Sequence, residues 1–519
     1  MAVSRRRGLV RREGMTTTSQ PQTLSTSRPT RRQWVALGVL ALTALLLSLD
    51  VSVLYLALPE LSADLGASTT EQLWMLDIYS FVLAGFLVTM GAVGDRIGRK
   101  RLLLIGAVAF GVASAAAAYA SSPGQLIFWR ALLGIAGATL MPSTMGLIRT
   151  IFTDEKAMMT AIGVWYSCFM GGMAVGPLVG GVLLQHFWWG SAFLLGVPFM
   201  VLLVVVGRRV LPESDRHAGA PVDVASSVLS LAAILPVIYG FKEIARGGDT
   251  TTALLTMSAG AALGIVFVRR QRRIANPLVD LTLFRSRAFS TALAVMLVGG
   301  VVMAGVSFLC SQWLQLVAGL DPLGAGLTML PANIALLVGA SSSARIAQRL
   351  GTARTMATGL LVCAVGLALY TQVGPAQGLG LLVLGMCLTS FGIMLPSTLT
   401  MGVMMQSAPP ERAGSVASMS ETSGEFGIAV GIAGLGSLAT FVYRDQLAPY
   451  SDAHSGSAAA LDSLAGAVRA ATTLPAEAAH GLVTAAQEAF TTSLAAVAGV
   501  GAALFVVCAV IALRVLRSR

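Results

Sequence analysis

Long apolar segments alternate with short polar ones along almost the whole chain. A run of about 20 apolar residues is long enough to cross a bilayer as a helix, and runs of this kind leave no room for a soluble domain between them. The pattern predicts an all-α integral membrane protein with fourteen spans, at residues 34–56, 73–93, 102–120, 126–148, 159–184, 190–207, 222–241, 251–268, 288–310, 323–344, 355–372, 377–403, 413–443 and 491–513.

Composition supports this class, because hydrophobic residues make up 55% of the 519-residue chain and charged residues only 11%. A soluble domain has about 25% charged residues. The five cysteines lie within apolar runs, so neither a disulfide framework nor a zinc site is expected. No metal cluster, nucleotide loop or nucleophile–base set points to an enzyme. Met15 is an alternative start to Met1, and no secretory signal is predicted.

Basic residues orient the predicted spans. With both termini placed in the cytoplasm, the tails and cytoplasmic loops hold nearly all of the 35 Lys and Arg residues, and the external loops hold only Lys242, Arg246, Arg444 and Arg469. This distribution follows the positive-inside rule and predicts a multi-pass protein of the cytoplasmic membrane. The net charge of +11 therefore reflects topology. Nucleic acid is not an expected partner, since no basic stripe is interleaved with stacking aromatic residues.

Four acidic residues lie inside long apolar segments: Asp50, Asp77, Glu421 and Glu425. A carboxylate in the hydrocarbon core costs roughly 2.5 kcal/mol or more, so it persists where it faces a wet cavity, holds a proton or binds a cation. Capping or snorkelling is the alternative for each acid, and is strongest for Asp77 and Glu421 near span ends. These four acids predict a membrane protein that moves protons and positively charged molecules.

The depth of these charges follows from a rise of about 1.5 Å per residue. Asp50, Asp77 and Arg130 fall in one layer in the outer part of the first half, so Arg130 is the expected partner of Asp50 or Asp77. Glu421 is expected in the inner half of its span and Glu425 near the middle. Spaced four residues apart, the two glutamates share one helix face.

The loop after the second span reads GAVGDRIGRKR over residues 91–101. It resembles the signature loop between spans two and three of the major facilitator superfamily. The resemblance implies a gating loop built from Gly91, Asp95, Arg96, Gly98 and Arg99. We expect Asp95 to cap the next helix and to pair with a nearby arginine, so that the loop latches two helices together.

A weaker copy of this loop, residues 344–351, follows the tenth span and has Gln348 where the first copy has Asp95. The separation of the two loops along the chain is the one expected of a transporter built from two duplicated halves. We therefore expect the major facilitator fold, with two six-helix halves plus two additional central helices. The expected parts are a cytoplasmic tail (1–33), an N-terminal half (34–211), two extra spans with a basic linker (212–287), and a C-terminal half (288–519) with a long external loop (444–490).

Further strings narrow the resemblance. The fifth span is similar to the antiporter motif of this superfamily, through Gly172, Gly176, Pro177, Gly180 and Gly181. Residues 129–138 resemble the motif that places an arginine, here Arg130, in the fourth span, although Leu133 stands where glutamine is usual. Segments 49–59, 74–79, 235–243 and 420–425 resemble fourteen-span drug:proton antiporters that export quaternary ammonium compounds.

The resemblance implies proton-coupled efflux of lipophilic, cationic drugs and biocides by alternating access. The implied proton-coupling and substrate residues are Asp50, Asp77, Arg130, Glu421 and Glu425. A dedicated exporter of one endogenous metabolite or antibiotic is the alternative, and a non-transporting membrane sensor or scaffold is the second. The expected partners are small lipophilic cations, protons and the bilayer; the chain is expected to be a monomer, and no cofactor is expected because a proton gradient drives transport. Loop 444–490 is predicted to form a helical hairpin over the outer mouth, as an inert cap or a gate.

Overall fold

The computed structural model describes residues 30–152, 154–213, 223–245, 248–274, 277, 281–375, 378–407, 413–454 and 458–516, and over these ranges the chain is helical with no strand. Most of the tail 1–33, the alternative start Met15 and the loop residue Arg246 lie outside the described residues. The helices are α1 (Arg31–Leu65), α2 (Thr69–Ile97), α3 (Arg99–Ala118), α4 (Pro123–Ile151), α5 (Glu155–His186), α6 (Ser191–Leu194), α7 (Gly196–Val210), α8 (Val224–Ala245), α9 (Thr250–Gln271), η1 (Leu283–Arg285), α10 (Arg287–Gln312), η2 (Trp313–Val317), α11 (Pro322–Leu350), α12 (Thr352–Tyr370), α13 (Leu379–Gln406), α14 (Ala413–His454), α15 (Ala458–Asp462), α16 (Leu464–Ala471) and α17 (Ala476–Leu516).

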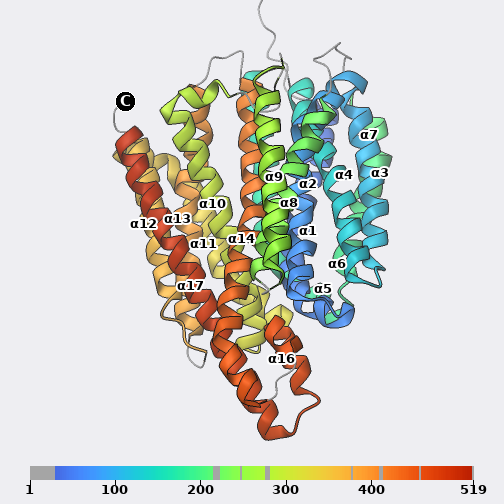
Figure 1. Cartoon of the computed structure of the whole chain (residues 1–519). Coiled ribbons are helices and arrows are strands. Elements are labelled where there is room, and N and C mark those ends of the chain that lie inside the picture. The colour runs from blue at the N-terminus through green and yellow to red at the C-terminus, as the bar shows by residue number, and fades with distance from the viewer. Residues whose placement is uncertain are drawn as a thin grey trace, which may run out of the picture.

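Fourteen segments of the described chain are long and apolar enough to cross a membrane, which confirms the predicted number of spans. They run side by side as one elongated bundle (Figure 1). Because the number of crossings is even, α1 begins and α17 ends at the same end of the bundle. We call it the termini end, and call the opposite end the hairpin end. Below, α1–α7 are the first half and α10–α17 the second half.

The hairpin end carries an extension that the sequence placed in a loop. Helix α14 continues to His454 and α17 starts at Ala476, with α15 and α16 between them, so the expected helical hairpin is confirmed but most of loop 444–490 is not loop. In Figure 1 this extension projects beyond the rest of the bundle. The segment is rich in alanine, the best helix former, and apolar residues such as Leu464 and Leu482 are buried within it.

The hairpin also covers the end of another helix. Arg469 of α16 donates from Nη1 to the carbonyl oxygens of Ser62 and Ala63, over 3.3 and 3.2 Å. These carbonyls belong to the last turn of α1, where a cation is favourable because of the helix dipole. The contact ties the hairpin to the C-terminal end of α1, and whether the hairpin acts as an inert cap or a gate stays a prediction.

Two helix junctions repeat the same geometry. Helices α2 and α3 meet at Gly98, and α11 and α12 meet at Gly351, with φ of 100° and 82° at the two glycines. The paired helices have nearly equal lengths, 29 and 20 residues against 29 and 19. A side chain is strained at positive φ, which explains why glycine stands at both corners. The repeat supports the internal duplication that the two loops suggested.

The glycine-rich face of α5 packs against two helices. Gly172, Gly176 and Gly180 lie against α1, where an added Cβ would meet Ser48, Ser52 and Val53. Near the hairpin end, Gly181 lies against the first residues of α11, in the second half. Small residues allow such close helix contacts, so the motif builds both the first half and its contact with the second.

Replacing Gly181 with leucine should force α5 and α11 apart. A Cβ there would lie 2.7 Å from the Pro322 carbonyl oxygen and 2.8 Å from the Leu323 Cα, and backbone atoms cannot yield as a side chain can. We expect Gly181→Leu to destabilise the protein by roughly 1–3 kcal/mol, measured as thermal unfolding in detergent. The control is Gly171→Leu on the same helix, where a Cβ meets nothing within 4 Å. Equal melting temperatures for the two variants would refute a tight contact.

Candidate functional site: buried charges between the two halves

Arg130 of α4 and Asp50 of α1 form an ion pair inside the first half. The Nη1–Oδ2 distance is 3.0 Å, and the two side chains are 2% and 7% exposed. The sequence left the partner of Arg130 open between two acids, and the structure assigns Asp50. Since a buried charge is tolerated when it is paired and hydrogen-bonded, this pair explains how both residues persist in an apolar bundle.

Helix α2 completes the surroundings of Arg130. Its Nε donates to the carbonyl oxygen of Met75 over 3.0 Å, and the guanidinium lies 4.6 Å from the centroid of the Tyr79 ring. The close approach of α4 and α2 depends on Gly134 and Gly137, where a Cβ would meet the Tyr79 carbonyl and hydroxyl oxygens at 2.7 and 3.0 Å. Arg130 thus joins α1, α2 and α4 at one point.

Asp77 has a different partner, which the sequence missed. Its Oδ2 lies 2.7 Å from the Nζ of Lys242 in α8, and the side chains are 0% and 1% exposed. The ammonium also lies 3.7 Å from the centroid of the Trp74 ring, close enough for a cation–π contact. The Oδ1 of Asp77 has no hydrogen-bond partner within the described part of the chain.

The assignment of Lys242 to an external loop was therefore wrong. Helix α8 continues to Ala245, beyond the predicted end at residue 241, and Glu243 next to Lys242 is also only 5% exposed. Glu243 accepts a hydrogen bond from the backbone of Asp249 over 3.3 Å. A span predicted from hydropathy ends at the first charged residues. In the folded protein the helix continues past them, because these charges have partners. The signal that places Lys242 within the span is segment 235–243, because its resemblance to a transporter motif includes both Lys242 and Glu243.

Glu421 and Glu425 face the first half from α14. The carboxyl group of Glu425 interacts with the Ser80 hydroxyl of α2, and the neighbouring Phe426 packs edge-on against Phe81, with centroids 6.2 Å apart. Glu421 lies one turn further toward the termini end, within electrostatic range of Arg149 in α4. Both glutamates are half-buried.

The predicted charges thus form one connected region with two ion pairs. Tyr79 lies within electrostatic range of Asp50, Arg130 and Glu425, so charges from α1, α4 and α14 all act on one phenol. Asp77 lies beside them but is engaged with Lys242. The region lies between the two halves, because α14 belongs to the second half and the other helices to the first.

The glycine-rich loop lies at the termini end. Asp95 accepts from Arg99, with Nη2 and Oδ1 2.8 Å apart, and Arg99 also donates to the Pro142 carbonyl oxygen of α4 over 3.3 Å. The expected latch is therefore made through Arg99, whereas Arg96 is exposed. The expectation that Asp95 caps the next helix was wrong, because Gly98 holds the N-cap position of α3 and no side chain caps it. Gly91 lies close to Pro142, and Gly146 leaves the space that the Arg99 guanidinium occupies.

A helical bundle of fourteen candidate spans, with ion pairs buried among its helices and a buried charged region where its two halves meet, has the architecture of a membrane transporter. Residues 40–432 match the family described as the Major Facilitator Superfamily. The chain belongs to this superfamily, whose members are transporters and not enzymes, and the family resemblance inferred from the loop and glycine motifs is confirmed.

Several relatives cover nearly the whole chain. The "Multidrug efflux pump LfrA" of Mycolicibacterium smegmatis is 40% identical over 490 residues, which cover 94% of this chain and 97% of that protein. The "Methyl viologen resistance protein SmvA" of Salmonella typhimurium is 34% identical, with 88% and 93% covered. The "Tetracenomycin C resistance and export protein" of Streptomyces glaucescens is 30% identical, with 93% and 91% covered.

Solved structures of transporters share the fold at low sequence identity. A bacterial homologue of the human lysosomal transporter Spinster, in an inward-facing and unoccupied conformation, has a TM-score of 0.64 at 14% identity and covers 94% of this chain and 99% of that one. A peptide transporter POT in complex with sulfate has a TM-score of 0.63 at 17% identity, with 93% and 95% covered. These similarities confirm the major facilitator fold.

Removing the ammonium of Lys242 should destabilise the protein, because Asp77 would remain buried without its partner. We expect Lys242→Met to cost about 3–5 kcal/mol, measured as thermal unfolding in detergent, and the double variant Asp77→Asn/Lys242→Met to recover most of it. The control is Lys100→Met, since Lys100 pairs with the Glu213 side chain, which is 81% exposed, and such surface pairs contribute less than about 1 kcal/mol. A Lys242→Met variant no less stable than Lys100→Met would contradict the buried pair.

Proposed function

We propose that the protein exports lipophilic cations, including drugs and biocides, across the cytoplasmic membrane, and that inward proton movement drives the export. The observation that carries the proposal is the connected region of Asp50, Arg130 and Glu425 between the two halves. Relatives named as multidrug efflux and methyl viologen resistance proteins support the substrate class, because methyl viologen is a dication.

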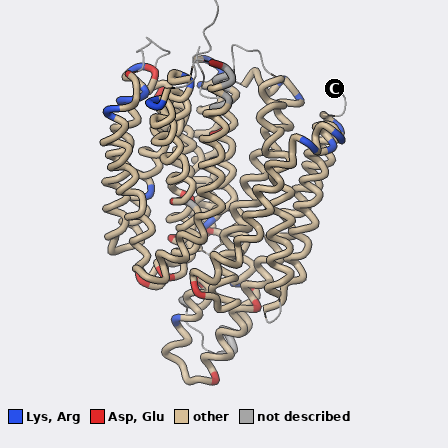
Figure 2. Tube along the Cα trace, turned by 180° about the vertical axis from the view of Figure 1, so that it is seen from behind, with Lys and Arg blue, Asp and Glu red and all other residues tan. Residues whose placement is uncertain are grey.

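The proposed orientation rests on the distribution of charge. Figure 2 shows blue Lys and Arg residues gathered mainly at the termini end, among them the described residues Arg99, Lys100, Arg101, Arg208, Arg209, Arg269, Arg270, Arg272, Arg273, Arg285, Arg287 and Arg514. Cytoplasmic loops carry such an excess. We therefore place the termini end in the cytoplasm and the hairpin end outside.

Contacts between the halves support a conformation that is closed at the hairpin end. At the hairpin end, Ser311 of α10 donates to the Tyr55 carbonyl oxygen over 3.1 Å, and Gln315 of η2 donates to the Leu56 carbonyl oxygen over 3.2 Å. The tight contact at Gly181 lies at the same end. The hairpin end is thus closed by direct contacts, and rocking of the halves about the buried charges would open it, as alternating access requires.

The charges suggest how proton and substrate would exchange. In the inward-open conformation Glu425, with Glu421 one turn nearer the cytoplasm, would attract a cation. After the halves rock, a proton arriving from outside would neutralise a carboxylate and release that cation. Asp50 is the proposed proton carrier, since Arg130 also donates to the Met75 carbonyl oxygen and would keep this partner if Asp50 were neutral.

Reconstitution into proteoliposomes tests the proposal. A pH-sensitive dye in the lumen should report proton movement when methyl viologen or ethidium is added to one side. Response to several unrelated cations supports broad efflux, and response to a single natural product would favour a dedicated exporter. Absence of proton-coupled flux for every compound would favour a sensor or scaffold and overturn the proposal.

Neutralising Asp50 should abolish coupling without unfolding the protein. We expect Asp50→Asn to stop uphill export of every substrate while the protein is still expressed and folded, although the loss of the buried partner of Arg130 should lower its melting temperature. Export is measured as substrate accumulation against its gradient. Glu60→Gln is the control, because Glu60 is an exposed acid on the same helix. Uphill export with normal proton movement in Asp50→Asn would rule out the coupling role.

Neutralising Glu425 should affect dications more than monocations. Two charges on the substrate are matched by two ionised carboxylates on one helix face, whereas one charge needs only one. We expect Glu425→Gln to lower methyl viologen export about tenfold more than ethidium export, equivalent to ~1.4 kcal/mol. Glu421→Gln should have a weaker effect because it lies nearer the interface. Equal losses for both substrates in Glu425→Gln would point to proton handling alone.

A further inference from the structure

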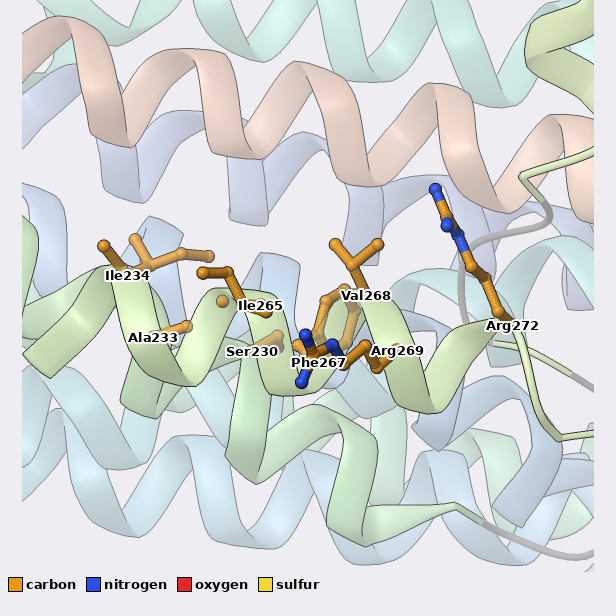
Figure 3. A pocket seen from close by; sticks show the side chains of 10 residues that line it. Ser230, Ala233, Ile234, Ile265, Phe267, Val268, Arg269 and Arg272 are labelled. Carbon is orange, nitrogen blue, oxygen red and sulfur yellow. The ribbon is translucent and has the colours of Figure 1, made fainter.

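A cavity of about 530 Å³ lies between α8 and α9, outside the charged region described above. Its walls are largely apolar, and arginines lie at one end. In Figure 3, Ile234, Ile265 and Val268 form a row that leads to Arg272. The lining residues are Ser230, Ala233, Ile234, Ala261, Gly264, Ile265, Phe267, Val268, Arg269 and Arg272.

Glycine spacing opens this cavity toward the termini end. At Gly260 the two helices touch, since a Cβ there would lie 2.6 Å from the Ala233 carbonyl oxygen. One turn further along α9, a Cβ at Gly264 would approach the Ala233 Cβ only to 4.0 Å. The last turn of α9 is held to α8 again, because Gln271 donates to the Ser226 hydroxyl over 2.8 Å. The space between these two contacts is the cavity.

Two arginines at the basic end lack acidic partners. Arg270 pairs with Asp223 over 2.8 Å, but Arg269 and Arg272 are exposed and have no ion pair with any described residue. Asp223 does not neutralise Arg269 or Arg272, because it pairs with Arg270. Partial burial opposes its ionisation, but hydrogen bonds from Ser226 and Arg270 outweigh this effect and hold the pKa of the Asp223 carboxyl below its ordinary value. The net charge at this end is therefore positive.

The cavity has the length of one lipid leaflet. Ala261, Ile265, Val268 and Arg272 follow one face of α9 at helical spacing, and eleven residues at about 1.5 Å each give ~16 Å. This is about half of the ~30 Å hydrocarbon core. An acyl chain that ran along this face from the middle of the bilayer would place its headgroup beside Arg272.

We propose that the α8–α9 cavity is a binding site for one anionic phospholipid from the leaflet at the termini end. The phosphate would accept from Arg272, and from Arg269 after its exposed side chain, which points away from Arg272 in Figure 3, has turned toward the same end, because guanidinium groups suit phosphate oxygens. An acyl chain would lie along Ile265 and Val268. Basic pockets between spans bind anionic headgroups in this way. The site uses neither the buried ion pairs nor Glu425, so the proposal does not depend on the transported substrate.

Native mass spectrometry of the detergent-purified protein tests the proposal, with phosphatidylglycerol and phosphatidylcholine as the probes. We expect one phosphatidylglycerol to remain bound at activation energies that strip phosphatidylcholine. Arg269→Gln/Arg272→Gln should weaken phosphatidylglycerol binding at least tenfold. The matched control is Arg273→Gln/Arg349→Gln, which removes two exposed arginines that do not line the cavity.

The apolar wall of the cavity, which would contact the acyl chain, is tested separately. Gly264→Leu should fill the cavity and weaken phosphatidylglycerol binding although both arginines remain, whereas Ala262→Leu, on the same turn but outside the lining, should not. Melting temperatures show that each variant is folded. Equal binding in the two arginine double variants, or unchanged binding in a folded Gly264→Leu, would overturn the site. Competition by glycerol 3-phosphate as strong as that by the lipid would indicate a free phosphate site and overturn it as well.

Discussion

The fold of the first half depends on how a single guanidinium is accommodated in an apolar bundle. Arg130 is 1% exposed, and a bare charge at this depth would be prohibitively costly. The carboxylate of Asp50, backbone carbonyls of α2 and the Tyr79 ring together satisfy it. These partners meet only because glycines let α4 approach α2. One electrostatic requirement thus fixes the relative positions of three helices and creates the polar centre beside which Glu425 lies.

The two additional helices are joined to this centre and are not a separate appendage. Lys242 of α8 neutralises Asp77 of α2, and the hydroxyls of Thr89 and Ser227 join the same two helices nearer the termini end. Helix α8 also packs against α14 through a small apolar cluster that includes Phe81, Ile238, Ala429 and Ala433. Since α2 and α14 belong to different halves, α8 contacts one helix from each half.

Gly181 and the helical hairpin contribute different contacts at the hairpin end. Gly181 lets the backbones of α5 and α11 touch without interlocking side chains, which is compatible with repeated separation and closure. The hairpin adds a polar contact from Arg469 to the end of α1. The closed hairpin end is therefore made of small contacts, each cheap to break, whereas the two ion pairs buried deeper in the bundle are the costly ones to break.

The sequence by itself determined the class, the fourteen spans, the latch loop and the layer that holds Asp50, Asp77 and Arg130. These follow from hydropathy, helix rise and local motifs, which are properties of neighbouring residues along the chain. Only the tertiary structure decided that Arg130 pairs with Asp50, that Asp77 pairs with Lys242, and that α14 and α17 continue well beyond the predicted ends of their spans. The physical reason is that hydropathy counts a charge as a cost wherever it stands. Whether that cost is removed depends on a partner from a distant segment, such as Lys242, 165 residues from Asp77, and no local pattern encodes that distance.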